Sequence, residues 1–85
     1  MMPREKLVKN GVKSLSDSEL LAIFLRTGLP GLEVLILADR LLAEFQGLRG
    51  LMQANETALT NCRGIGPAKS AQLSAVLEMT RRYLQ

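Results

Sequence analysis

The sequence predicts an all-α fold of five or six short helices. Leu and Ala dominate the apolar residues, and β-branched and aromatic residues are few, which favours helices over strands. Apolar residues recur at helical spacing, and no segment alternates apolar and polar residues as a half-buried strand would. With 85 residues, 47% of them hydrophobic, the chain has room for one domain, which we expect to span residues 1–85.

The N-terminal half carries two helix signals. Pro3 suits the first turn of a helix and Gly11 suits the left-handed position after its end, so we expect a short surface helix between them. Residues 16–19, Ser-Asp-Ser-Glu, have the sequence of a capping box. In such a box the Ser16 hydroxyl accepts the Glu19 amide and the Glu19 carboxylate accepts the Ser16 amide, which marks the start of the next helix.

That second helix is expected to end at Thr27-Gly28, and a turn at residues 29–31 leads to a third helix that ends near Gln46. The apolar stripe of the third helix is Val34, Ala38, Leu41, Leu42 and Phe45. Three further residues are expected to widen its buried face: Leu32, Leu35 and Ile36. A helical connector over residues 48–54 follows, and Asn55 is a good cap for the next helix.

The segment between the last two predicted helices is the most informative in the chain. Its pattern is typical of a helix-hairpin-helix element: Leu59-x-x-Cys62-x-Gly64-Ile65-Gly66-x-x-x-Ser70-x-x-Leu73. Gly64 and Gly66 allow positive φ angles and let a phosphate approach without meeting a Cβ. Ile65 is expected to point inward, and the small Ser70 to let the helices pack closely. The inner stripe of the last helix is then Leu73, Val76, Leu77, Thr80 and Leu84.

This hairpin also presents the N-terminus of the last helix, where amides and the helix dipole attract an anion. The candidate residues for binding a DNA backbone are Arg63, Gly64, Ile65, Gly66, Ala68 and Lys69. Lys69 lies in the first turn, where a positive charge opposes the helix dipole, so a ligand explains this lysine better than stability does. The alternative is a purely structural turn with a solvated lysine.

A faint internal repeat aligns residues 27–30 with residues 63–66. It predicts a degenerate first helix-hairpin-helix unit over residues 17–46 and a complete second unit over residues 55–84. Glu33 stands where the second unit has its lysine, and its charge would repel a phosphate. We therefore expect the turn of the first unit to serve packing and the hairpin of the second unit to bind the DNA backbone.

Composition excludes several classes of site. One cysteine, Cys62, and no histidine leave no disulfide and no Cys/His zinc site. The carboxylates are scattered and no nucleophile–base pair is apparent, so we expect neither catalysis nor a cofactor. The longest apolar run, residues 34–38, is too short to span a bilayer and no signal sequence is present, so we expect a cytoplasmic protein without membrane contact. The net charge of +3 favours polyanions only mildly.

Four motifs together resemble the N-terminal domain of the bacterial RadC family, whose members are labelled DNA repair proteins. The motifs are Pro3-Arg4-Glu5-Lys6-Leu7, Leu15-Ser16-Asp17-x-Glu19-Leu20-Leu21-Ala22-Ile23, Leu25-Arg26-Thr27-Gly28 and Gly64-Ile65-Gly66-Pro67-Ala68-Lys69. Family members continue into a JAB/MPN-like metalloprotease-type domain with a metal site based on histidine and aspartate. The sequence has no histidine, so we interpret it as the excised N-terminal domain, with the C-terminal domain as its partner and no metal ligand or catalytic residue of its own.

The resemblance to helix-hairpin-helix proteins in general implies DNA-backbone contacts through the amides of Gly64, Gly66, Ala68 and Lys69. It also implies a monovalent cation held by carbonyls near Thr60, Cys62 and Ile65. The expected function is therefore weak, sequence-independent DNA binding by a non-catalytic domain. The alternative is a protein-interaction module that docks the C-terminal domain, which the apolar surplus of the third helix motivates.

Overall fold

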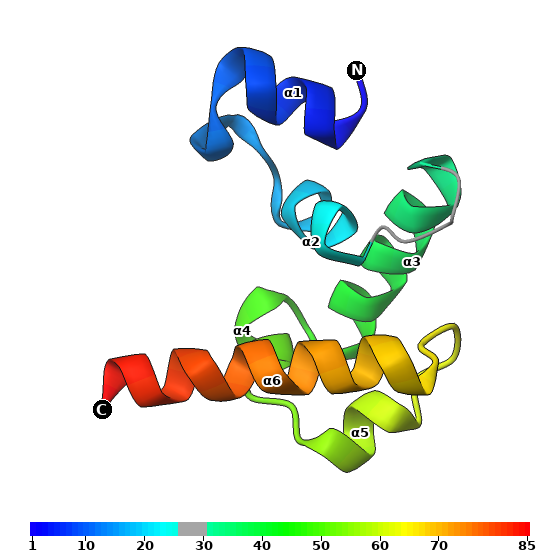
Figure 1. Cartoon of the computed structure of the whole chain (residues 1–85). Coiled ribbons are helices and arrows are strands. Elements are labelled where there is room, and N and C mark those ends of the chain that lie inside the picture. The colour runs from blue at the N-terminus through cyan, green and yellow to red at the C-terminus, as the bar shows by residue number, and fades with distance from the viewer. Residues whose placement is uncertain (26–30) are drawn as a thin grey trace. The chain divides into compact units, whose positions relative to one another are not determined.

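The computed structural model describes residues 1–25 and 31–85. Within these ranges it contains six α-helices, one short 3-10 helix and no strand, which confirms the prediction of an all-α fold (Figure 1). The helices form two compact units, Met1–Glu44 and Phe45–Gln85, each of which is described by itself. Over the described ranges, no helix has both the length and the apolar character needed to cross a bilayer.

The first unit contains α1 (Pro3–Asn10), the 3-10 helix η1 (Val12–Ser14), α2 (Asp17–Leu25) and α3 (Gly31–Glu44). Pro3 begins α1, and Gly11 ends it with a φ of 87° and an N–H donated to the Leu7 carbonyl at 2.9 Å. Both predicted signals of this helix are therefore confirmed. The predicted first hairpin at residues 27–31 lies outside the described residues except for Gly31, which begins α3, and so does the side chain of Leu32.

The predicted capping box is present at the start of α2. The Ser16 hydroxyl accepts the N–H of Glu19 at 3.1 Å, and the Glu19 carboxylate accepts the N–H of Ser16 at 2.8 Å. The same carboxylate lies 3.1 Å from Nζ of Lys6 in α1. Two hydrogen bonds hold the pKa of Glu19 below its usual range: the one from the Ser16 amide has the larger effect, and the one from Lys6 has the smaller. Glu19 therefore caps α2 and attaches α1 to it.

The core of the first unit lies between α2 and α3, which pack against each other (Figure 1). Its buried side chains on these helices are Leu21, Ala22, Leu25, Val34, Leu37, Ala38 and Leu41. The Ser18 hydroxyl donates to the Asp39 carboxylate and joins the two helices. The expectation for Ile36 is wrong, because its side chain is 49% exposed while Leu37 is buried. Each residue turns the helix by about 100°, so Ile36 points away from the face that Val34 and Leu37 share.

The second unit contains α4 (Leu48–Met52), α5 (Glu56–Thr60) and α6 (Pro67–Leu84). A turn with positive φ at Gln46 (63°) and Gly47 (104°) leads into α4. Gly50 packs directly against this turn, because a Cβ added to it would lie 1.7 Å from the carbonyl oxygen of Phe45. Glycine is therefore the residue that this close approach of two backbone segments requires.

The core of the second unit is apolar and formed by all three helices and the hairpin. Its buried side chains are Leu51, Ala54, Leu59, Cys62, Ile65, Leu73 and Leu77. Asn55 caps α5 as predicted, since its side chain accepts the N–H of Ala58 at 2.8 Å. Leu84 was predicted to face inward but is 76% exposed. The reason is length: α5 has 5 residues and α6 has 18, so α5 covers only part of α6.

Candidate nucleic-acid interface

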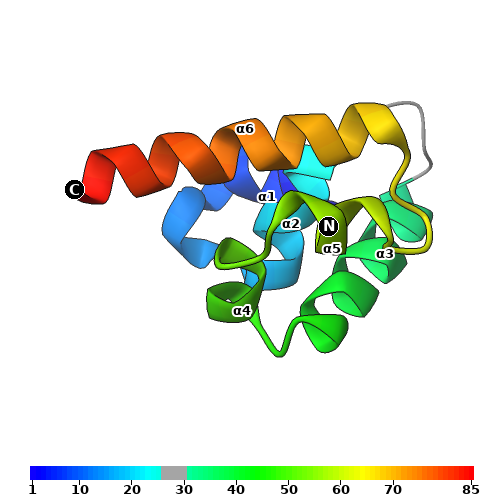
Figure 2. The ribbon, with the colours of Figure 1, turned by 90° about the horizontal axis from the view of Figure 1, so that it is seen from below.

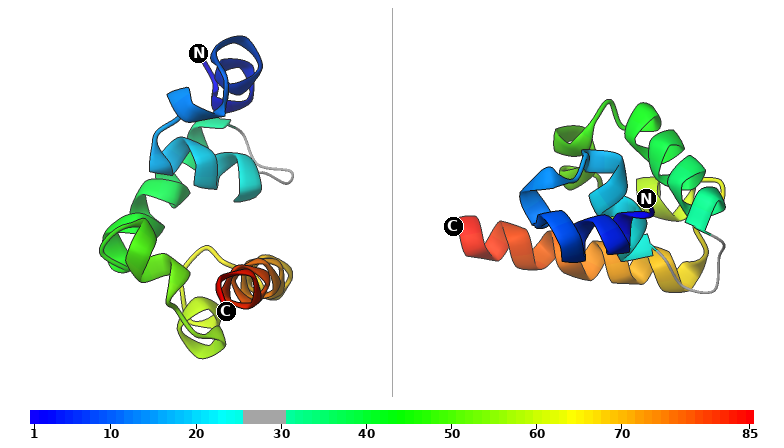
Figure 3. Two further views of the ribbon diagram at one scale, coloured as in Figure 1. Left: turned by 90° about the vertical axis from the view of Figure 1, so that its left-hand side faces the viewer. Right: turned by 90° about the horizontal axis from the view of Figure 1, so that it is seen from above.

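The candidate interface is the hairpin that joins α5 to α6. The two helices lie side by side, with residues 61–66 connecting them at one end (Figures 1 and 3). The hydroxyls of Thr60 in α5 and Ser70 in α6 lie 3.1 Å apart, and Ser70 is 5% exposed. The small Ser70 thus lets the helices meet closely beside the hairpin. Figure 2 shows the hairpin at the end of α6 opposite the C-terminus.

Gly64 and Ile65 form the hairpin turn itself. Gly64 has a φ of 88°, so the prediction of a positive φ is confirmed at this position. The N–H of Ile65 then donates to the carbonyl of Cys62 at 3.2 Å and closes the turn. The Ile65 side chain is only 7% exposed, as expected for a residue that anchors the hairpin in the core.

Gly66 differs from the prediction. Its φ is −81° and its ψ is 173°, an extended conformation open to any residue, so the expected positive φ is wrong here. The physical reason is that Gly66 is the N-cap of α6, a position that normally takes β-region angles. A Cβ added to Gly66 would meet no atom within 4 Å. The backbone at Gly66 therefore borders open space, which is what the close approach of a ligand requires.

The N-terminus of α6 follows directly. Pro67 is the first helical residue, and no side chain caps the helix. The first helical hydrogen bond runs from the N–H of Ser70 to the carbonyl of Gly66 at 2.9 Å, so the amides of Ala68 and Lys69 precede it. The Lys69 side chain is half-buried, while Ala68 is exposed. Three of the four predicted amide donors, Gly66, Ala68 and Lys69, thus belong to this first turn or to its N-cap, while Gly64 lies in the hairpin turn before it.

Arg63 and the predicted cation ligands lie in the same hairpin. Arg63 is exposed, and its side chain has no hydrogen bond or ion pair among the described residues. Thr60 ends α5, while Cys62 and Ile65 lie in the hairpin and are buried. The carbonyl of Cys62 accepts the Ile65 amide, and its thiol donates to the carbonyl of Ala58 at 3.2 Å. A monovalent cation at these carbonyls stays a prediction.

The positive charge of the chain is concentrated in the half that carries the hairpin. Residues 1–44 contain six basic and six acidic residues, whereas residues 45–85 contain five basic and two acidic ones. The second unit therefore carries the whole net charge of +3. The total charge alone does not reveal this asymmetry, which appears when the basic and acidic residues are counted for each unit.

A second basic group, which sequence reasoning did not single out, lies on the C-terminal half of α6. Arg82 Nε is 3.0 Å and Arg81 Nη1 is 3.4 Å from the carboxylate of Glu78. The hydrogen bonds from Arg82 and then Arg81 hold the pKa of Glu78 below its usual range. The (i, i+3) and (i, i+4) spacing is a signal that could have predicted this cluster.

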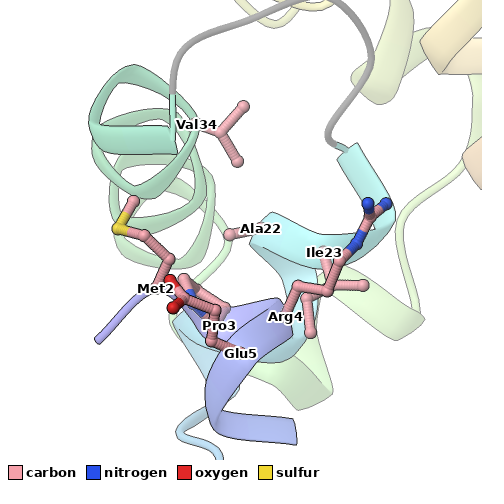
Figure 4. Close-up of a pocket in the computed structure, with 7 residues that line it drawn as sticks. All are labelled: Met2, Pro3, Arg4, Glu5, Ala22, Ile23 and Val34. Carbon is pink, nitrogen blue, oxygen red and sulfur yellow. The ribbon is translucent and has the colours of Figure 1, made fainter. Parts of the chain in front are cut away.

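The first unit contains a cavity of about 250 Å³ where its N-terminus meets α2 and α3. Its lining, drawn in Figure 4, is Met2, Pro3, Arg4, Glu5, Ala22, Ile23 and Val34. No histidine exists in the chain, and across residues 1–25 and 31–85 no three Cys, Asp or Glu side chains gather as metal ligands would. The cavity combines apolar side chains with the charged residues Arg4 and Glu5.

The comparisons with known proteins cover nearly the whole chain. The family model described as UPF0758 N-terminal matches residues 1–71. The chain is 58% identical to a UPF0758 protein of Aliivibrio salmonicida, over 96% of this chain and 37% of that protein. It is 59% identical to one of Vibrio vulnificus (98% and 37%) and 57% identical to one of Azotobacter vinelandii (96% and 37%).

The chain thus spans 37% of the length of these relatives, and no solved structure matches it significantly. The similarity is spread over both units, because the matches to these relatives cover at least 96% of the chain. On this evidence the chain belongs to the UPF0758 family, the RadC-like family whose N-terminal domain its motifs resemble.

Proposed function

We propose that this domain binds the DNA backbone, without sequence specificity, through the hairpin between α5 and α6. The observation that supports the proposal is the open space at Gly66, directly before a helix N-terminus without a side-chain cap. Backbone amides in such a position point at an approaching anion, and the helix dipole favours its negative charge. A phosphate group can reach these amides because glycine places no Cβ in its way.

The charges around the hairpin support the same proposal. Arg63 is exposed just before the turn, and Lys69 lies in the first turn of α6. No acidic residue occupies that first turn, although negative charge is what a helix N-terminus normally favours. A basic first turn fits a surface that receives its negative charge from a ligand.

The expected affinity is low, because one hairpin contacts few phosphates. Nonspecific DNA binding typically has dissociation constants of ~10⁻⁴–10⁻⁶ M, with log K falling by about 0.9 per phosphate for each unit of log salt concentration. A hairpin that contacts about two phosphates should therefore show a slope of roughly −2. Such a domain would serve as a weak backbone anchor within a larger protein.

Fluorescence anisotropy with labelled single-stranded, duplex and branched DNA at low salt tests the proposal. Lys69→Glu should weaken binding to all three DNAs by roughly tenfold or more, because it replaces an attraction by a repulsion at the phosphate. Arg49→Glu is the matched control: it makes the same charge change in the same unit, on α4 and away from the hairpin. If Lys69→Glu binds as tightly as the unmodified chain, the hairpin is not the contact.

A docking role within the larger family members is the second candidate function. It is favoured by the large apolar side chains that α6 leaves exposed: Met79 at 63%, Tyr83 at 85% and Leu84 at 76%. The relatives are also much longer than this chain, so they contain further polypeptide for such a surface to contact. The absence of any DNA binding in the anisotropy titration would favour this candidate over the first.

A further inference from the structure

The second unit contains a groove lined by residues of α4, of the segment after it and of the C-terminal half of α6. Figure 1 shows that the C-terminal half of α6 lies at the other end of this helix from the hairpin. Its volume is about 530 Å³, and it is lined by Arg49, Met52, Gln53, Thr80, Arg81 and Leu84. Met52 is half-buried and Leu84 is 76% exposed, so apolar surface remains in contact with solvent here. The groove combines this apolar surface with two guanidinium groups.

One of the two arginines is held in place by the protein. Nη2 of Arg81 donates to the carbonyl of Ala54 at 3.0 Å, and Nη1 lies 3.4 Å from the carboxylate of Glu78. Because Arg82 bonds the same carboxylate, the charge of Glu78 is shared between two guanidinium groups. The cluster on α6 therefore keeps a net positive charge, and Arg81 presents it from a fixed position.

The other arginine is available for a partner. Arg49 is exposed on α4, and its side chain makes no hydrogen bond or ion pair within the described part of the chain. Its guanidinium lines the groove together with that of Arg81. The guanidinium of Arg49 matches the geometry of a carboxylate, which it can bind through two parallel hydrogen bonds. Arg81 adds its charge and its remaining N–H groups, since Nη1 and Nη2 already bond Glu78 and Ala54.

The lining distinguishes between classes of partner. Surfaces that bind DNA are more polar and more positively charged than surfaces that bind proteins, and their basic side chains contact phosphates. Met and Arg are the residues enriched at protein–protein interfaces, where a hydrophobic centre has a polar rim. A lining that combines Met52 and Leu84 with Arg49 and Arg81 fits the second description, and its positive charge favours an acidic partner.

We propose that this groove binds an acidic polypeptide segment that carries apolar side chains beside its carboxylates. The apolar side chains contact Met52 and Leu84, and the carboxylates pair with Arg49 and Arg81. The site is separate from the hairpin, so the proposal does not depend on DNA binding. It gives the domain one surface for a phosphate backbone and another for a protein.

The test is an NMR titration of the ¹⁵N-labelled 85-residue chain with defined peptide mixtures. The first probe is a mixture of short peptides in which every position is Asp, Glu, Leu or Phe. A second replaces the acidic residues by Lys and Arg, and a third replaces the apolar residues by Ser. We expect saturable amide shifts around the groove with the first mixture only, centred on Arg49, Met52 and Arg81.

Matched charge reversals locate the site. Arg49→Glu should weaken binding of the acidic–apolar mixture by roughly tenfold and leave DNA binding unchanged, because Arg49 lies in the groove. Arg63→Glu makes the same charge change at the hairpin and should do the reverse. Since both side chains are exposed, the amide spectra should show that both variants remain folded.

Three results would overturn the proposal. The first is the absence of groove shifts with the acidic–apolar mixture. The second is equal binding of the basic mixture, which would show that the charges do not select the partner. The third is a set of groove shifts caused by duplex DNA alone, which would make the two arginines phosphate contacts.

Discussion

Gly64 and Gly66 lie on either side of Ile65 in the hairpin, but their φ angles have opposite signs. Gly64 has a φ of 88°, in the region that disfavours other residues, while Gly66 has a φ of −81°. The first glycine is therefore required by the turn, and the second is not required by backbone conformation at all. Substitutions at these two glycines should therefore affect the stability of the hairpin and its proposed DNA binding differently.

Gly66→Ser should stabilise the domain and weaken DNA binding. Serine is favoured over glycine at an N-cap by a few tenths of a kcal/mol, and the angles at residue 66 suit it. Its side chain would, however, accept an amide of the first turn and occupy the space that a phosphate needs. Urea unfolding and DNA anisotropy on the same variant measure both effects.

Gly64→Ala is the comparison for that variant, and it should cost about 1 kcal/mol or more of unfolding free energy because of its positive φ. A Gly66→Ser variant that binds DNA as tightly as the unmodified chain would contradict the proposed role of the open space. The opposite signs of the two stability changes follow from the N-cap preference at residue 66 and from the positive φ at residue 64, and they hold whether or not DNA binds.

The Thr60–Ser70 pair predicts a non-additive loss of stability. Thr60→Val should leave the buried Ser70 hydroxyl without its partner at 3.1 Å and cost about 1–3 kcal/mol. Adding Ser70→Ala should then cost little more, because no polar group remains unsatisfied. A double-mutant cycle by urea unfolding measures the coupling, and strictly additive changes would show that the two hydroxyls do not interact.

Gly50→Ala should destabilise the second unit by about 2 kcal/mol or more. The added Cβ would lie 1.7 Å from the Phe45 carbonyl oxygen, so the backbone must shift to admit it. Gly66→Ala is the control for an added Cβ, because a Cβ there meets nothing within 4 Å, and the loss of glycine at the N-cap should cost it no more than about 1 kcal/mol. Thermal unfolding of the two variants should therefore differ clearly, and equal melting temperatures would refute the close approach at Gly50.

The capping box predicts a loss of stability in acid. Because the folded-state pKa of Glu19 lies below the ordinary glutamate value of 4.5, its contribution to stability is complete above that pH and is lost as the pH falls through the folded-state pKa. The lowered pKa of Glu78 acts in the same direction. Unfolding free energies at about pH 7 and roughly pH 3 should therefore differ less in Glu19→Gln than in the unmodified chain.

Glu56→Gln is the control for that experiment, since the Glu56 side chain makes no hydrogen bond or ion pair among the described residues. Glu19→Gln should therefore lose less stability in acid than Glu56→Gln does. Ser16→Ala should cost about 1 kcal/mol at neutral pH through loss of the N-cap. If Glu19→Gln loses as much stability in acid as the unmodified chain, the box does not cause the acid sensitivity.

Local signals in the sequence predicted the helix ends well. Gly11, the capping box at Ser16 and the cap at Asn55 are all found as expected, because each depends on residues within one helical turn. The faces of helices were predicted less well. Ile36 and Leu84 are apolar but exposed, because burial depends on where a neighbouring helix lies and how far it extends.

The hairpin shows the same limit at a finer scale. The sequence identified Gly64 and Gly66 as a pair. Only the structure shows that Gly64 is needed for its positive φ, whereas Gly66 borders open space that a side chain would fill. The groove that Arg49 and Arg81 line could not be predicted, because these residues are far apart in the chain and line one groove only in the folded unit. Contacts between distant segments are what local patterns do not encode.

The arrangement of α5 and α6 has a consequence for folding speed. They are consecutive helices joined by residues 61–66, so the loop that must close between them is short and its entropic cost is small. Small helical proteins that are rich in such local contacts fold within microseconds to milliseconds. The hairpin should therefore form early as the chain folds, ahead of contacts between more distant segments.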